Sequence, residues 1–353
     1  MLRGVILELR KERQRWWRGR IPTLWQENPK AVYRWLAAVP LAWGTVPILT
    51  ASGVQCTTTP EVDGVVRGFW VDRVWRMHAE VDGEVKLAEF VHSEFFPHVP
   101  QCTWPHSPWS AERVKKVVSS LRDGSAPGVR GIPIAVWKNL PELYLELVAA
   151  MLNQVEESGV WPKELLHAYV AMIPKASGGS RPQDQRPITV LDVVYRVWSK
   201  GTITEWGPTL NQSYLGQAAM GFRAQTGTLH VAQLLSDLIA LQKWRGKELW
   251  LVSFDVEKCF PSLPWWAVFG VMQHAGVHPH TVRAFRVYNS LRHRFRYGQV
   301  DGAEWSMANG LAQGCPASPD LLNMLFEAFH RWAADQHGRG GCGTARGLSE
   351  FRR

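Results

Sequence analysis

Hydrophobic residues recur at helical spacing after Ser110, whereas before it Pro and Gly recur and only 66–80 and 84–96 look weakly helical. Ser110 can cap the start of a helix, and Gly159 can end one. Residues 228–244 give the cleanest amphipathic pattern, with a shared face of Val231, Leu234, Leu235 and Leu238. The spacing predicts helices over 110–121, 141–157, 228–244, 264–276, 281–291 and from Ser318 up to His337.

Short apolar runs predict strands between these helices. AYVAMIPK and RPITVL read as two strands joined by the loop Ala176 to Gln185. LWLVSF, Leu249–Phe254, reads as a buried strand that ends at Asp255. HRFRYGQ and EWSMANG resemble a hairpin with its turn at Asp301-Gly302. Strands and helices together indicate an α+β chain.

The composition of the chain indicates which kinds of molecule it could bind. The chain has 353 residues, 46% of them hydrophobic, which suffices for real cores. Its net charge of +9 favours polyanions such as nucleic acid or an acidic membrane face. The uncharged stretch 35–60 is long enough to span a membrane, but Pro40, Gly44 and Pro47 interrupt it, so no membrane partner is expected. Scattered cysteines without a C-x-x-C pair indicate a reduced, intracellular protein, nuclear or cytoplasmic.

The first 20 residues are basic and contain Trp16 and Trp17. Such a mixture can hold a phosphate backbone and stack on bases. A solvated helix face with two docking aromatics explains it equally well. We treat residues 1–109 as an N-terminal, linker-like region that is irregular or helical.

Asp255 is the residue with the clearest chemical meaning. A carboxylate at the end of a strand is a usual place to hold Mg²⁺, which requires hard oxygen ligands. Taken alone, such an Asp is more often a strand terminator or a helix cap. The other motifs in the sequence therefore decide how Asp255 is interpreted.

Five such motifs, here called blocks, follow one another along the chain. They are SAPGVRGIP, AMIPKASGGSRPQDQRPITVLDVVYRVWSK, MGFRAQTGTLH, SFDVEKCFPSLP and GLAQGCPASPDLLNMLF. The series resembles the fingers and palm blocks of reverse transcriptases, most closely those of non-LTR (LINE-type) retrotransposons, over roughly Ser110 to Phe329. The resemblance implies right-hand fingers and a partial palm with an antiparallel sheet, over residues 110–336. Residues 337–353 form a patternless Gly/Arg-rich tail.

The resemblance also implies a role for particular residues. Asp255, with the backbone carbonyl of Val256, would bind catalytic Mg²⁺ (or Mn²⁺), and Phe260 would exclude a ribose 2′-hydroxyl. Cations and a block beside the nascent base pair would hold the deoxynucleoside triphosphate (dNTP): Lys175, Arg186, Gln313 and Gly314. Arg223 would contact template. The implied partners are an RNA template, a DNA primer and dNTPs.

Each of these residues also has a structural interpretation. Phe260 can be a core aromatic, and Lys175 can be a solvated turn residue. Arg186 can be an ion-pair partner of Asp184 or Asp192. A stretch of arginines without acids could follow a phosphate backbone or simply be solvated: Arg283, Arg286, Arg292, Arg294 and Arg296.

One family feature is missing from the sequence. Two-metal nucleotidyl transfer requires carboxylates from two strands, and the family supplies the second set as an aromatic, any residue, then Asp-Asp. No Asp-Asp pair occurs in the 353 residues. We therefore expect a domain truncated before that motif and a poor or inactive polymerase by itself. The alternative is a non-catalytic nucleic-acid-binding relic of a retroelement polymerase.

Overall fold

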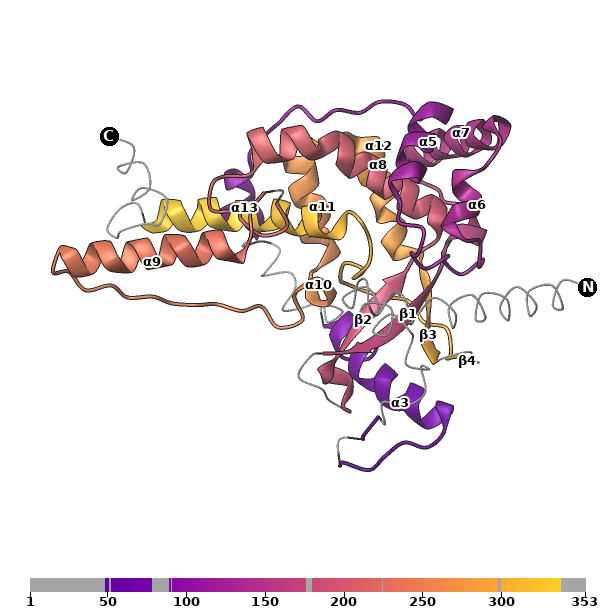
Figure 1. Cartoon of the computed structure of the whole chain (residues 1–353), viewed down its shortest axis with the longest axis horizontal. Helices are drawn as coiled ribbons and strands as arrows, with labels where there is room; N and C mark the ends of the chain where they lie inside the picture. The colour runs from indigo at the N-terminus through magenta and orange to yellow at the C-terminus, as the bar shows by residue number, and fades with distance from the viewer. Residues whose placement is uncertain are drawn as a thin grey trace, which may run out of the picture. The chain divides into compact units, whose positions relative to one another are not determined.

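Four short strands form a mixed sheet in the order β2-β1-β3-β4 (Figure 1). β1 (His167–Pro174) pairs antiparallel with β2 (Gln185–Val190) and parallel with β3 (Arg292–Tyr297). β3 pairs antiparallel with β4 (Val300–Asp301). This computed structural model describes residues 48–50, 52–77, 89, 91–175, 180–223, 225–297 and 300–337, which lie in one unit, Pro47–Arg353. The paired strands AYVAMIPK and RPITVL are confirmed.

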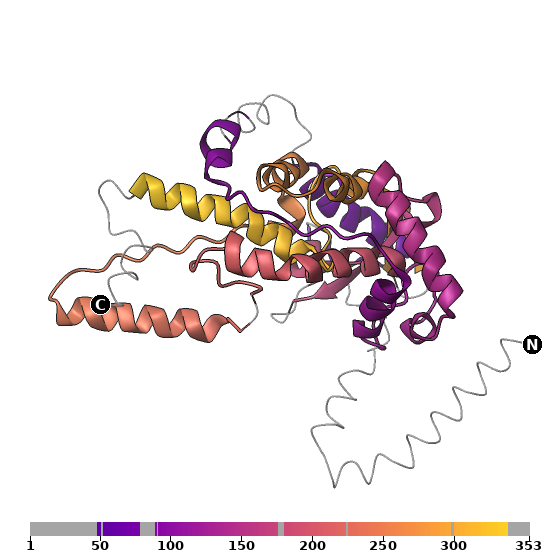
Figure 2. The ribbon, with the colours of Figure 1, turned by 90° about the horizontal axis from the view of Figure 1, so that it is seen from above.

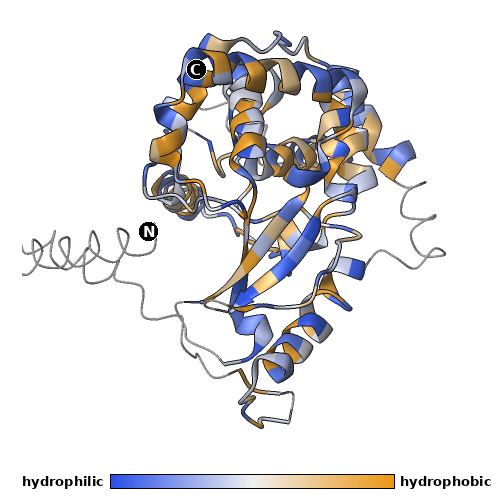
Figure 3. Cartoon of the chain, turned by 90° about the vertical axis from the view of Figure 1, so that its right-hand side faces the viewer, coloured by the Kyte–Doolittle hydropathy of each residue, from blue (hydrophilic) through white to orange (hydrophobic). Residues whose placement is uncertain are grey.

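The sheet buries one face and exposes the other, as alternation along its strands requires. Val170 and Phe295 are fully buried on the inner face. The outer face carries Tyr169 opposite Arg294, and the guanidinium of Arg296 lies 4.1 Å from the Tyr169 ring. Figure 3 shows hydrophilic and hydrophobic residues mixed along these strands. The arginine stretch thus includes alternate residues of one strand that share its outer face.

α3 (Thr59–Trp70) contributes to the core on the inner face of the sheet. Thr58 caps it, and Glu61 completes a capping box by accepting from the Thr58 backbone N–H. Trp75, just beyond the helix, stacks on Trp305 at 4.6 Å between ring centroids. Aromatic packing therefore joins the region before Ser110 to the sheet.

The remaining helices pack around a larger core. Their bounds are α5 (Ala111–Ser120), α6 (Ile134–Lys138), α7 (Glu142–Ser158), α8 (Val193–Thr209), α11 (Trp265–His274), α12 (Pro279–Phe285) and α13 (Ser318–His337). Ser110 accepts from the Arg113 amide at the start of α5. Gly159 ends α7 in the left-handed conformation, with φ +73°. Both predicted helix boundaries are confirmed.

Single turns connect these helices. α10 is Cys259–Ser262. Five 3₁₀ turns lie at Val74–Arg76, Phe96–His98, Lys163–Leu165, Pro182–Asp184 and Arg286–Asn289. Two π turns lie at Val91–Phe95 and Leu210–Tyr214. The helix expected over 281–291 thus becomes α12 followed by a 3₁₀ turn.

The strand expected at Leu249–Phe254 is absent, which corrects the sequence prediction. These residues are irregular, and all except the half-buried Leu249 are exposed, with Trp250 85% and Phe254 88% accessible. Hydrophobicity alone does not make a strand, because its N–H and C=O groups require a neighbouring strand. Within the described residues the paired strands are β1 to β4 alone, so this segment has no sheet partner.

α9 (Thr228–Trp244) has the bounds predicted for it but none of its residues is buried. α9 and the chain that follows it project from the rest of this unit in both views (Figures 1 and 2). The amphipathic pattern of α9 is therefore real, while its apolar face remains largely exposed, with Leu234 and Leu235 each 38% accessible.

Two further predictions of strand geometry need correction. The sheet is mixed rather than antiparallel, because β1 and β3 run in the same direction. The hairpin forms, but its turn precedes Val300, because Asp301 already pairs with Arg296. The bidentate contact of that pair, at 2.7 and 3.0 Å, explains why Asp301 belongs to a strand rather than to the turn.

Several predictions fall on residues that the structure does not describe. They concern the basic start with Trp16 and Trp17, the loop residues 176–179 and the tail after His337. Among the helices that are described, none is both long and apolar enough to cross a membrane.

His293 makes the stability of the sheet depend on pH. Its buried ring stacks on Trp305 at 4.7 Å, and burial lowers the pKa of His293 to about 3 from 6.5, with the Leu291 carbonyl acting weakly in the opposite direction. The unfolded chain therefore binds a proton that the native chain does not, so stability present above pH 6.5 is lost as the pH falls. We expect urea unfolding to show a loss of about 2 kcal/mol between about pH 7.5 and pH 5.

The variant His293→Phe should flatten this acid limb, because it removes the titrating ring and keeps an aromatic on Trp305. Exposed His167 provides the control, since His167→Gln should keep the wild-type slope. An unchanged slope in His293→Phe would assign the acid limb to another group.

Candidate active site

One pocket gathers all of the predicted site residues except Arg223. Its volume is about 720 Å³. The predicted residues that line it are Lys175, Arg186, Asp255, Val256, Phe260, Gln313 and Gly314. They come from β2, the residue after β1, the segment before α10, α10 itself and the loop before α13, so the fold brings together positions that are far apart in sequence.

A short backbone bond fixes the Gln313-Gly314 side of the pocket. The Thr189 amide of β2 donates to the Gln313 carbonyl at 2.6 Å. Gly314 has φ +122°, and a Cβ there would lie 2.3 Å from the Thr189 carbonyl oxygen. Only glycine allows this close approach between the loop and the strand.

Phe260 is attached to the same loop from the other side. The Leu311 amide donates to the Phe260 carbonyl at 2.7 Å, and the Gly310 amide donates to Leu263 at 2.7 Å. The Phe260 ring meets Phe222 edge-on at 5.9 Å between centroids. Phe260 is thus partly buried, packing on the core with one side while lining the pocket.

Asp255 lies on an exposed, irregular segment of the chain. It ends the irregular segment 249–254, and Asp255, Val256 and Glu257 are all exposed. Lys258 then adopts a left-handed conformation, with φ +50°, where the chain turns into α10. The acidic side chains of the pocket, Asp255 and Glu257, therefore come from one exposed segment.

Three cations face these two acids: Lys175, Arg186 and Lys258. The Lys258 ammonium donates to the Gln183 carbonyl at 2.9 Å. Partial burial lowers the pKa of Lys258, and repulsion from the nearby Lys175 ammonium lowers it further. Like charges held this close suit an anionic ligand with several charges.

Arg186 is not used as a structural partner of either acid considered from the sequence. Asp192 instead caps α8 by accepting from Val194, and Arg130 holds its carboxylate through two bonds of 2.8 Å. No ion pair joins Arg186 to Asp184 in the described residues. Its exposed guanidinium remains available at the pocket.

The sequence interpretation missed Lys258 and Trp70. The available signal for Lys258 was a cation placed between Asp255 and Phe260 in one block. Trp70 had no such signal, because it comes from α3 and reaches the pocket only through tertiary packing. Its indole donates to the Pro182 carbonyl at 3.1 Å, and the Lys258 ammonium lies 5.5 Å from its ring.

Arg223 lies outside the pocket. Its guanidinium donates to the carbonyls of Asn211 and Gly216 at 2.5 and 2.9 Å. These bonds tie the MGFR segment to the π turn Leu210–Tyr214 and to the residues just after it, so the described contacts of Arg223 are structural.

Comparison with known proteins identifies the class to which this arrangement belongs. Residues 173–345 match the family described as reverse transcriptase (RNA-dependent DNA polymerase). The chain therefore carries a reverse transcriptase domain, with a small mixed sheet and many helices.

The similar proteins are Pol proteins of non-LTR retrotransposons. The Pol polyprotein of a type-1 R2 element of Nasonia vitripennis is 24% identical over 226 residues, 64% of this chain and 21% of its own length. The polyprotein of the type-2 element R2DM of Drosophila melanogaster is 24% identical over 63% of the chain and 21% of its length. The RNA-directed DNA polymerase of the Drosophila melanogaster mobile element jockey is 25% identical over 68% and 26%. The chain thus spans about a fifth to a quarter of the curated relatives it matches.

Proposed function

We propose that the pocket binds a dNTP for RNA-templated DNA synthesis on a DNA primer. The observation that carries this proposal is the meeting of Lys175, Arg186, Asp255, Phe260 and Gln313 around one pocket. Core packing alone would not collect exposed cations and acids at one place.

The cations would hold the triphosphate. Lys175 would act as a point charge, and the Arg186 guanidinium would offer a planar fork to two phosphate oxygens. Lys258 would add a third positive charge, already placed beside Lys175. Gln313 and Gly314 would flank the base and sugar, where Gly314 lets the loop lie close to β2.

Asp255 and the Val256 carbonyl would bind Mg²⁺, with Mn²⁺ as a substitute. The residues fit this ion, because an exposed carboxylate and a carbonyl are hard oxygen ligands that leave space for water. When bound, the metal supplies charge neutralisation and activation of the primer hydroxyl. Phe260 would contact the sugar and exclude a 2′-hydroxyl.

In this proposal β1, β2 and the adjoining loop take the part of the fingers, and the segment around Asp255 takes that of a partial palm. Arg223 would act on the template by positioning the MGFR segment rather than by direct contact. Template RNA, primer DNA and dNTPs are the proposed partners.

A second candidate function is non-catalytic nucleic-acid binding. It is favoured by the exposed segment before Asp255 and by the origin of both pocket acids from that one segment. Two-metal transfer requires carboxylates from two elements. In this case the chain alone would show little or no polymerisation and would keep salt-sensitive RNA binding.

The test measures nucleotide binding, which does not depend on turnover. Equilibrium dialysis of labelled dTTP with Mg²⁺ should show binding that Arg186→Ala weakens by about 10- to 100-fold, through loss of charge-assisted contacts. Arg294→Ala is the matched control, because Arg294 lies on the same sheet face and pairs with Glu304 away from the pocket. Equal affinity in the wild type and Arg186→Ala would remove the triphosphate role. Absent dNTP binding with salt-sensitive RNA binding would favour the second function.

A further inference from the structure

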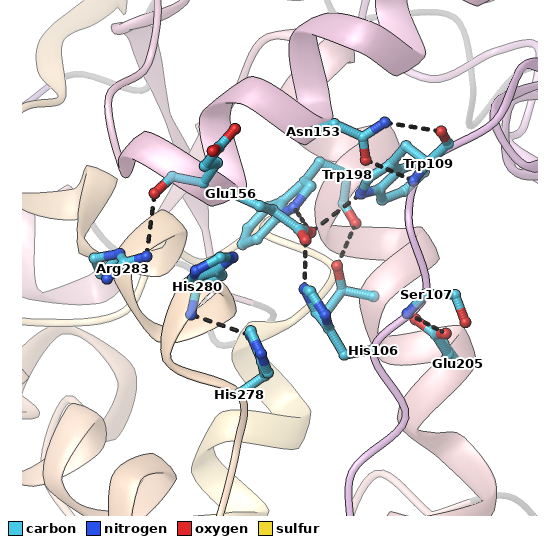
Figure 4. A network of polar contacts seen from close by, with 12 residues as sticks. His106, Ser107, Trp109, Asn153, Glu156, Trp198, Glu205, His278, His280 and Arg283 are labelled. Carbon is cyan, nitrogen blue, oxygen red and sulfur yellow. Dashed lines mark hydrogen bonds and ion pairs between the residues drawn. The ribbon is translucent and has the colours of Figure 1, made fainter.

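Three histidines meet at a point that the proposed polymerase site does not use. His106 lies in the segment before α5, and His278 and His280 begin α12 (Figure 4). One ring nitrogen from each lies within 4.8 Å of the others. The rings of His106 and His278 stack at 3.9 Å between centroids.

A buried acid supports this cluster. Glu156 of α7 is 5% exposed, and its Oε2 lies 2.8 Å from His106 Nε2. Its Oε1 accepts from the indoles of Trp109 and Trp198, at 3.1 and 2.7 Å. Every oxygen of this carboxylate therefore has a partner, and the His106 ring is held by an anion.

These hydrogen bonds fix which nitrogen carries the proton. Because the Glu156 carboxylate can only accept, His106 donates from Nε2 and keeps the lone pair on Nδ1. His278 Nδ1 accepts from the His280 amide at 3.3 Å, so its lone pair is already engaged, and an ion bound there would have to displace this long contact.

We infer that His106, His278 and His280 bind one divalent transition-metal ion, with Zn²⁺ as the expected occupant. Neutral imidazole nitrogens suit Zn²⁺, and they do not suit Mg²⁺, which takes oxygen ligands. Three protein nitrogens leave a fourth tetrahedral position for water. Glu156 is the carboxylate behind a ligating histidine that such sites use to orient the ring.

Binding an ion requires the side chains to rearrange, because the His106 and His278 rings stack with an interplanar angle of 9° and one must turn before both lone pairs can meet at one ion. Tetrahedral Zn²⁺ with Zn–N bonds of about 2.0–2.1 Å places its nitrogens roughly 3.3 Å apart. The His106 side chain is 27% exposed and can rotate toward that spacing. Glu156 supplies the neighbouring negative charge, while the Arg283 guanidinium is directed to the Glu157 carbonyl at 3.1 Å.

A bound ion would join three segments that are far apart in sequence. The segment 104–110 already contacts the chain before α12, because Trp104 donates to the Ala275 carbonyl at 2.8 Å. Zn²⁺ would add a second attachment at His106 and connect both to α7 through Glu156. The ion would therefore raise the stability of the helical core without touching the nucleotide pocket.

The experiment titrates the full chain with Zn²⁺ and with Co²⁺, in excess Mg²⁺ so that oxygen sites are occupied. We expect one ion per chain, a tetrahedral Co²⁺ visible spectrum, and a melting temperature that Zn²⁺ raises and chelation lowers. His106→Gln and His280→Gln should each lower the affinity by about 100-fold or more. His230→Gln on exposed α9 is the control and should bind as the wild type does.

Glu156→Gln tests the proton assignment with the fold retained. Its amide oxygen can still accept from both indoles, while its NH₂ group would donate to His106 Nε2 and move the ring proton to Nδ1. We expect a loss of affinity of about 10- to 100-fold, with an unchanged metal-free circular dichroism spectrum. Stoichiometric binding that survives in His106→Gln and His280→Gln, or no binding by the wild type, would overturn the site.

Discussion

Replacing Asp255 with asparagine is expected to reduce whatever Mg²⁺-dependent primer extension the chain retains on an RNA template by about 1,000-fold or more. The change keeps the size of the side chain and removes the negative charge that would hold the metal. Asp255 is exposed and contributes to no core cluster, so the variant should fold as the wild type does. Loss of extension would then report on chemistry rather than on stability.

A second measurement, of dTTP binding, tests the same role of Asp255. It does not depend on how fast this chain extends a primer by itself. Mg²⁺ should strengthen dTTP binding by the wild type and should have little effect on Asp255→Asn. The control is Asp123→Asn, because Asp123 is an exposed acid paired with Lys138 outside the pocket. Robust extension by Asp255→Asn, with the wild-type response to Mg²⁺, would remove the metal role of this residue.

Replacing Gly314 with alanine should lower the free energy of unfolding by about 3 kcal/mol. The new Cβ would meet the Thr189 carbonyl oxygen at 2.3 Å, in a backbone conformation that side chains disfavour. Relief would require the loop to move away from β2, which would lengthen the bond from the Thr189 amide to Gln313. Binding of dTTP should therefore weaken together with stability.

Urea unfolding of Gly314→Ala and Gly207→Ala provides the comparison. Gly207 lies within α8 with nothing near its absent Cβ, so alanine there should stabilise the chain by about 0.5–1 kcal/mol. Equal stability of the two variants would mean that the approach of Gly314 to β2 is looser than this structure shows.

The sequence predicted most helix boundaries because local chemistry determines them. The Ser110 cap, the left-handed Gly159 and the Ser318 start of α13 each depend on a few neighbouring residues. Alternation likewise located β1 and β2. These signals are local, and the structure confirms them.

Burial and strand pairing could not be predicted in this way. The apolar face of α9 and the run Leu249–Phe254 both read as buried, yet both are exposed. An apolar segment is buried only where other segments cover it, and that depends on the whole fold. The same limit explains Trp70, whose place at the pocket follows from the docking of α3.

The candidate pocket was recovered from ordered blocks, which carry information about distant positions. The blocks brought together Lys175, Arg186, Asp255 and Gln313, which the structure places around one cavity. They did not reveal Lys258, or the contact between Asp192 and Arg130 that holds the SAPGVRGIP loop to α8. The histidine cluster had no signal of this kind, because His106 is far in sequence from the His278 and His280 pair.

Two parts of the chain that line the pocket, the segment around Asp255 and the loop at Gly314, would tolerate random substitution differently. Around Asp255, exposed residues outside the core can change with little effect on folding, typically within about 0.5 kcal/mol. At Gly314, packing against β2 ties any change to the integrity of the domain. Under relaxed selection, the side proposed to bind metal would therefore accumulate substitutions first, while selection for folding alone would preserve the loop at Gly314.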